Sequence, residues 1–332
     1  MSLPNSRIVV RTAHNQAGMA AWLKERGLEH RVSVITGWPL ALPNSSTACV
    51  VVANAARDHE GAIRWALGQG YPVLAEKPLA LCGDSMHQLV AEAQAAKVSL
   101  CPAQVFLFAP WFEDFASEVA AKGGAHTVEI EFEDPVTEMR YGETKRYDPG
   151  VPLFVDWLPH VTAILGTLLP SLDGDCERIE FGNGGSSLVL FLRLSGRPCC
   201  LRFRRNGRTR KRVVRVNAGG AISLHLDFSL EPATMFGNGR PLATDPSWLE
   251  EQRPLAAMLT TFFSSSANGT SDLRFGLDAA LCAGRLIDQV RPLYRAALLP
   301  WLHNELESGQ VGDELIYALN ELALSRALVL YD

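Results

Sequence analysis

The feature that most constrains the fold is the alternation of short apolar runs with helix-like segments over the first third of the chain. The run ACVVVA at 48–53 is continuous, as in a strand that is buried on both faces of a parallel sheet. Further strands are predicted at 7–10, 31–36, 72–75 and 100–105, with helices at 17–26, 59–68 and 86–96. Strands separated by helices of about 10–15 residues indicate βαβ units. This part of the chain therefore predicts a Rossmann-like α/β domain with a doubly wound parallel sheet.

The pattern changes after about residue 122. The segment 126–132 alternates apolar and polar residues, which is typical of an antiparallel strand with one exposed face. A helix is predicted at 155–168, strands at 178–181, 187–194, 199–205, 213–216 and 221–228, and helices at 255–263, 277–293 and 315–330. The dipeptide Asn206-Gly207 between two of these strands indicates a hairpin.

Together these patterns predict a two-domain fold of the α/β plus α+β class. The Rossmann-like domain covers residues 1–120, and the second domain covers 121–332. The second domain is expected to hold a large, mostly antiparallel open sheet that helices cover on one face. As an alternative to covering the sheet, the helices in 250–332 are expected to pack back on the first domain.

Composition excludes several classes of protein. Of the 332 residues, 47% are hydrophobic and 20% are charged, which excludes a disordered chain. The net charge of −5 gives no general attraction to nucleic acid or to a membrane surface. The seven cysteines form no CxxC pair and no cluster with histidine, so we expect reduced thiols and no metal site. With neither a signal peptide nor an apolar run of about 18 residues, we expect a cytoplasmic protein without a membrane role.

Three residues stand out as a chemical group. Lys77 lies in the tripeptide Glu76-Lys77-Pro78 directly after a predicted strand, and Asp156 and His160 follow four residues apart on a predicted helix. The stretches that hold these residues, 48–81 and 147–169, resemble the Gfo/Idh/MocA oxidoreductases, as do 204–226 and 248–266. This family is named for glucose–fructose oxidoreductase and inositol dehydrogenase. The resemblance covers about residues 48–298.

The resemblance implies a Rossmann domain followed by a domain with a large open sheet. It also implies transfer of a hydride between NAD(P) and a small polar substrate, which is a polyol, a sugar, or an imine or ketone. By resemblance, the catalytic residues are Lys77, Asp156 and His160. Members of the family often pair through the open sheet face, so the resemblance also implies a homo-oligomer.

The residue types suit this chemistry. A histidine titrates near neutrality and can exchange a proton with a substrate hydroxyl, while a lysine ammonium can stabilise negative charge on the substrate oxygen. Asp156 lies one helical turn before His160, on the same helix face, and can orient either partner. The alternatives are a surface lysine at Lys77 and a solvated pair at Asp156 and His160.

The nucleotide-binding residues depart from the family pattern. Thr12, His14 and Ala17 stand where a G-x-G-x-x-G loop has its glycines, and the His14 side chain occupies space that the pyrophosphate needs. The second strand ends in Thr36 without the usual acidic residue, so NADP is preferred over NAD. The turn after the third strand begins with Asn54. The expected cofactor-binding residues are Thr12, His14, Asn15, Gln16, Thr36, Asn54, Glu76 and Lys77.

Three interpretations of this departure remain open. The first is an oxidoreductase that binds NADP or NAD through altered contacts at a helix N-terminus. The second is a protein that has lost the dinucleotide and does non-redox acid–base chemistry in the same cleft. The third is a non-catalytic binding or partner subunit.

A basic run in the second domain also has two interpretations. Eight basic residues lie between Arg202 and Arg215. They fit either an anion or nucleic-acid patch or the exposed face of two sheet strands. The overall negative charge favours the exposed face, and we expect no nucleic-acid binding.

Overall fold

The computed structural model describes residues 7–12, 16–37, 48–137, 139–140, 143–144, 151–219, 222–242 and 253–308. The chain divides into two compact units, Met1–Ala48 and Cys49–Asp332. The predicted helix at 315–330 lies outside the described residues, as do His14 and Asn15.

The first unit is a βαβ element. It contains β1 (Ile8–Arg11), α1 (Gln16–Glu25) and β2 (Val32–Ile35), and β1 pairs with β2 in parallel. Helix α1 ends where Gly27 adopts a positive φ of 63° and its amide donates to the Lys24 carbonyl. Glycine adopts this conformation without a steric penalty, so it terminates the helix where the sequence predicts.

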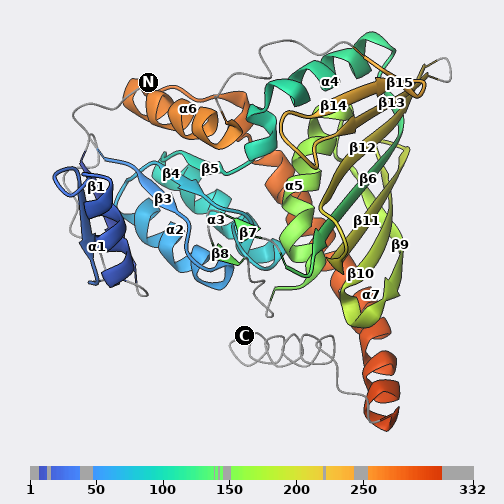
Figure 1. Ribbon diagram of the computed structural model, residues 1–332, viewed down its shortest axis with the longest axis horizontal. Coiled ribbons are helices and arrows are strands. Elements are labelled where there is room, and N and C mark those ends of the chain that lie inside the picture. Colours follow the sequence, from blue (N-terminus) through green and yellow to red (C-terminus); the bar gives the residue numbers. More distant parts are fainter. Residues whose placement is uncertain are drawn as a thin grey trace. The chain divides into compact units, whose positions relative to one another are not determined.

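The second unit begins with a three-stranded parallel sheet in the order β3-β4-β5 (Figure 1). Its elements are β3 (Val50–Val52), η2 (Ala56–Asp58), α2 (His59–Gly68), β4 (Val73–Ala75), α3 (Gly83–Ala96), β5 (Leu100–Pro102), η3 (Val105–Phe108) and α4 (Pro110–Ala121). The predicted alternation of strands and helices is confirmed, although the parallel strands of the described residues form two separate sheets. The predicted domain boundary between residues 120 and 121 falls at the end of α4, inside the second unit, and stays a prediction.

An eight-stranded sheet follows, in the order β15-β14-β13-β12-β6-β11-β10-β9. Its strands are β6 (Ala125–Pro135), β9 (Gly174–Gly182), β10 (Ser187–Leu194), β11 (Arg197–Gly207), β12 (Lys211–Ala218), β13 (Ile222–Asp227), β14 (Thr234–Gly237) and β15 (Arg240–Pro241). Only β6 and β11 pair in parallel, so the expected large and mostly antiparallel sheet is confirmed. The short strands β7 (Met139–Arg140) and β8 (Glu143–Thr144) pair separately.

The hairpin predicted at Asn206-Gly207 is wrong. β6 lies between β11 and β12, so the two strands flanking the dipeptide do not pair with each other. The chain instead crosses the end of β6, where the Glu133 carboxylate accepts a hydrogen bond from the Arg208 amide at 3.1 Å. Gly207 packs so closely on Glu133 that an added Cβ would lie 2.2 Å from its carboxylate oxygen. The absence of a side chain at Gly207 therefore allows the backbone to pass this close to Glu133.

Helices cover one face of the large sheet (Figure 1). Alternate residues of β10 and β12 are buried, and α5 (Leu153–Leu168) and α7 (Asp278–Ser308) pack against each other and against this sheet. The interior side chains include Phe132, Phe154 and Phe203, each exposed by 2% or less. One face is thus apolar and covered, and α5 contacts β6 and β11 on it.

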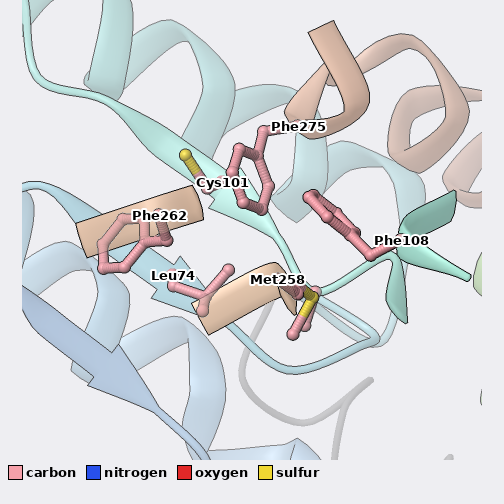
Figure 2. Packing of buried hydrophobic residues seen from close by; sticks show 7 residues of the cluster. Leu74, Cys101, Phe108, Met258, Phe262 and Phe275 are labelled. Carbon is pink, nitrogen blue, oxygen red and sulfur yellow. The ribbon is translucent and has the colours of Figure 1, made fainter. Parts of the chain in front are cut away.

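Helix α6 (Pro254–Asn268) packs on the parallel sheet of the second unit. Figure 2 shows Leu74 of β4 and Cys101 of β5 in one buried cluster with Met258 and Phe262 of α6. Phe275 of η7 (Leu273–Phe275) completes it from the C-terminal side. A C-terminal helix therefore contributes to the core beside the strand that precedes Lys77.

None of the described helices combines the length and the hydropathy that crossing a membrane requires. All seven cysteines belong to the described residues, and all seven are free thiols.

Candidate active site

Lys77 lies just past the carboxyl end of β4. The Glu76 amide donates to the Val52 carbonyl at 2.8 Å, which continues the pairing of β3 with β4 by one residue. The next peptide bond, Lys77–Pro78, is cis. In open parallel sheets, ligands bind beyond the carboxyl ends of the strands. Lys77 thus lies where such a fold positions reactive groups.

Asp156 lies in the first turn of α5, the long helix that precedes β9. Its amide donates to the Pro152 carbonyl at 3.1 Å, and Pro152 is the N-cap residue directly before α5. Proline is suited to a helix start because it has no amide hydrogen to leave unpaired. The N-terminal end of a helix also favours a negative charge, which suits an ionised Asp156.

Lys77 and Asp156, two of the residues that the resemblance singles out, form an ion pair. The Lys77 ammonium donates to Oδ1 of the Asp156 carboxylate and, at 3.1 Å, to the main-chain carbonyl of the same residue. The two side chains are 19% and 22% exposed. This degree of burial shields the pair from bulk water but leaves it accessible to a small molecule.

Arg205 is a third member of this group, and the sequence pattern does not single it out. Nη2 of Arg205 lies 3.0 Å from Oδ2 of Asp156, and Nη1 donates to the Val151 carbonyl at 3.0 Å. Arg204 and Arg202, which the same basic run includes, are exposed. Arg205 and Arg212 are instead shielded, and each pairs with an aspartate. The exposed-face interpretation of this run therefore holds for some of its members only.

The surroundings keep Asp156 ionised. Burial by itself would raise the pKa of Asp156, but the charges and hydrogen bonds of Lys77 and Arg205 outweigh it and hold the pKa well below its usual range. A carboxylate in this state is a poor proton acceptor at neutral pH. The arrangement therefore suits Asp156 to orienting and charge-balancing, and leaves proton exchange to another group.

His160 lies one helical turn beyond Asp156 on α5. Its ring centroid is 4.9 Å from that of Phe106 in η3, with the planes at 51°. Phe106 in turn packs edge-on against Phe228 at 5.1 Å. The imidazole therefore packs beside an aromatic cluster. The structure thus brings Lys77 and Asp156 into contact and places His160 on the adjacent turn.

His59 connects the two loops that follow β3 and β4. The residue is 2% exposed, with Nδ1 2.7 Å from the Pro78 carbonyl and Nε2 3.0 Å from the Asn54 carbonyl. The Asn54 side-chain amide donates to the Asp58 carbonyl at 3.1 Å. His59 therefore connects the loop that carries Lys77 to the loop that follows β3.

The expected cofactor-binding residues are divided between the two units. Thr12, Gln16 and Thr36 belong to the first unit, where the Thr12 amide donates to the Ile35 carbonyl at 3.4 Å. Asn54, Glu76 and Lys77 belong to the second unit. Within the described parts of the chain, no three His, Cys, Asp or Glu side chains come together as metal ligands.

Comparison with known proteins identifies the class of fold. No protein-family model and no curated protein sequence matches the chain. Solved structures do match, and they are oxidoreductases of the Gfo/Idh/MocA type at low sequence identity. The fold that the sequence resemblance implies is therefore confirmed.

Three of these structures illustrate the similarity of fold. The 3-ketoreductase KijD10 from Actinomadura kijaniata, in complex with TDP-benzene and NADP, has a TM-score of 0.67 and 18% identity, over 86% of this chain and 88% of its own. UDP-N-acetylglucosamine 3-dehydrogenase GnnA from Acidithiobacillus ferrooxidans has a TM-score of 0.64 and 17% identity, over 88% and 98%. A protein from Sinorhizobium meliloti that is assigned as a myo-inositol dehydrogenase has a TM-score of 0.65 and 17% identity, over 87% and 90%.

Proposed function

We propose that the chain is an NAD(P)-dependent oxidoreductase that transfers a hydride to or from a small polar substrate. The substrate is a polyol, a sugar, or an imine or ketone. The observation that carries the proposal is the Lys77–Asp156 pair at the carboxyl end of β4, with His160 one turn further along α5. The matching structures support it, since they include a 3-ketoreductase with bound NADP and a nucleotide-sugar 3-dehydrogenase.

The first unit fits the phosphate groups of a dinucleotide. Helix α1 follows directly after β1 and leads back to the parallel strand β2, so the N-terminus of α1 lies at the carboxyl end of β1. Helix N-termini present free amide groups and a positive dipole end, which bind phosphate without all three glycines. The proposed contacts remain Thr12, His14, Asn15, Gln16 and Thr36 in this unit, and Asn54, Glu76 and Lys77 in the other. We propose NADP ahead of NAD as the cofactor.

Lys77 contributes a hydrogen-bond donor and a positive charge. An ammonium has three donors, and two of those of Lys77 are directed at Asp156 among the described residues, so the third is left for a substrate oxygen or nitrogen. That contact stabilises the negative charge that develops on the substrate when the hydride is gained or lost. The nicotinamide, when bound, supplies or accepts the hydride.

His160 moves the proton and Asp156 orients the group. In the reductive direction His160 donates a proton to the substrate oxygen, and in the oxidative direction it accepts the proton from the hydroxyl. Asp156 stays ionised because Lys77 and Arg205 lower its pKa. The proton therefore does not rest on Asp156, whose role is to hold Lys77.

We also propose a homo-oligomer that pairs through the open sheet face. Leu230 and Val136 at one end of this face are 81% and 62% exposed. Beside them lies a hollow of about 700 Å³ that Glu131, Lys211 and Arg215 help to line. Paired charges with exposed apolar residues suit a second protein surface better than nucleic acid. Seven free cysteines favour a cytoplasmic location.

The function is tested by a hydride-transfer assay over a set of polyols, sugars, nucleotide sugars, ketones and imines with NADPH or NADH. We expect turnover of at least one substrate class. His160→Gln should lower turnover by roughly 10²–10⁴-fold, the usual share of a general acid–base. His87→Gln, an exposed histidine of α3, is the matched control and should leave turnover unchanged. Full activity of His160→Gln contradicts the assigned role.

A further inference from the structure

We propose that Arg205 is a positioning residue of this site. It fixes the carboxylate of Asp156 in the orientation from which Asp156 holds Lys77. The inference rests on the proposed function for its catalytic meaning. Its structural part, the control of Asp156 by Arg205, can be tested without substrate or nucleotide.

The guanidinium connects two elements at the site. One of its nitrogens, Nη2, contacts Oδ2 of Asp156, while Nη1 donates to the carbonyl of Val151, just before α5 begins, each at 3.0 Å. The Arg205 side chain is only 11% exposed. Because the guanidinium is planar, fixing one nitrogen on the main chain also fixes the direction of the other. β11 therefore determines where the Asp156 carboxylate points.

The two carboxylate oxygens of Asp156 have different partners. Oδ2 is taken by Arg205, so Oδ1 is turned toward the Lys77 ammonium. Lysine is a compact charge on a flexible stem and would not by itself restrict rotation of the carboxylate. With Arg205 in place, the Lys77 ammonium is held by the Asp156 carbonyl and Oδ1 together.

Arg205 also changes the net charge of the group. Lys77 and Asp156 alone are neutral as a pair, whereas Lys77, Asp156 and Arg205 together carry one positive charge. The positive charges of Lys77 and Arg205 both face the Asp156 carboxylate, from two different elements. The remaining titratable side chain on this part of α5 is His160.

A purely structural tether is the competing interpretation. Such a tether between β11 and the start of α5 would affect the stability of the protein but would not act on the ionisation of Asp156. The protonation midpoint of Asp156 therefore distinguishes the two interpretations, and thermal unfolding alone does not.

The experiment compares the full-length wild type with Arg205→Met and Arg205→Gln. Arg204→Met is the matched control, because Arg204 is the preceding residue on β11 and is exposed. The probe is the ¹³Cγ signal of Asp156, assigned with Asp156→Asn and followed from neutral pH into acid. We expect the midpoint in both Arg205 variants to rise by about one pH unit or more, since a partly buried neighbouring charge contributes shifts of that size. Arg204→Met should match the wild type.

Arg205→Gln keeps a polar donor and covers the case in which Arg205→Met does not fold. A midpoint within about 0.3 pH units of the wild type in a folded Arg205 variant overturns the proposal, because a neighbouring charge would shift it further. If the chain is active, kcat should fall by roughly 10²-fold, as for other misplaced catalytic groups, while KM for the nucleotide stays unchanged. If neither NADPH nor NADH binds, the proposed function fails while the result on Asp156 still decides the role of Arg205.

Discussion

The ammonium of Lys77 bonds two different oxygens of Asp156, its carboxylate Oδ1 and its main-chain carbonyl, across 79 positions of sequence. This double contact fixes the lysine relative to the start of α5. It also explains why a helix and a strand end that are distant in the sequence form one chemical group.

Lys77→Met should abolish most of the turnover while the fold persists. The substitution removes the donor that stabilises charge on the substrate, and such donors typically contribute roughly 10²–10³-fold in kcat. The measurement is steady-state kinetics on the best substrate of the hydride-transfer assay, with circular dichroism as a check of the fold. Lys122→Met, at an exposed lysine directly after α4 that pairs with Glu118, should keep wild-type kinetics. Unchanged activity of Lys77→Met rules out the assigned site.

Asp156→Asn should destabilise the protein in a pH-dependent manner. The pKa of Asp156 is lowered in the folded protein, so the unfolded chain binds its proton first as the pH falls. The stabilisation from the carboxylate is therefore complete above the unfolded pKa of about 3.9 and is lost in more acidic solution. Urea unfolding should show a difference from the wild type of about 3 kcal/mol at neutral pH, and the difference should shrink toward pH 3. A difference that stays constant over this range contradicts the account.

His59→Ala should lower the free energy of unfolding by about 2–3 kcal/mol, because it removes a buried imidazole from contact with two main-chain carbonyls, of which that of Pro78 is buried. The affected groups are the carbonyls of Asn54 and Pro78. Urea unfolding measures the change. His87→Ala, at an exposed position of α3, is the control and should change stability by less than about 0.5 kcal/mol. Equal effects of the two substitutions would mean that His59 does not hold these loops.

Gly207→Ala and Gly61→Ala should have opposite effects. At Gly207 the new methyl group collides with the Glu133 side chain, which is 6% exposed and cannot move freely, so we expect a loss of about 1–3 kcal/mol. Gly61 lies within α2 and has no atom within 4 Å of an added Cβ, so alanine there should stabilise by about 0.5–1 kcal/mol. Thermal unfolding of both variants measures the pair. A neutral Gly207→Ala would show that the crossing over β6 tolerates a larger residue.

Much of the fold follows from local patterns in the sequence. The helix at 59–68 and the strand at 187–194 have the bounds that periodicity predicts. Apolar runs and alternating burial are local properties, so the sequence reveals them directly. The pairing of strands is not local. The hairpin prediction at Asn206-Gly207 failed because β6, more than seventy residues earlier, inserts between the strands on either side.

The site, too, was predicted only in part, because contacts between distant segments are not local properties of the sequence. Lys77, Asp156 and His160 belong to motifs that the resemblance covers, and the first two lie in contact. Arg205 lies in a stretch that the resemblance covers but is surrounded by other basic residues, so the sequence gives no sign that it differs from Arg204. Strand alternation turns these neighbours to opposite faces, but the sequence does not tell which face lies toward α5.

The most direct test of the central claim is titration of the purified protein with NADPH and with NADH, followed by nucleotide fluorescence and by thermal shift. The account predicts saturable binding of at least one of them, with NADPH the tighter, and a rise in Tm that grows with nucleotide concentration. Absence of binding by either nucleotide up to millimolar concentration would contradict it.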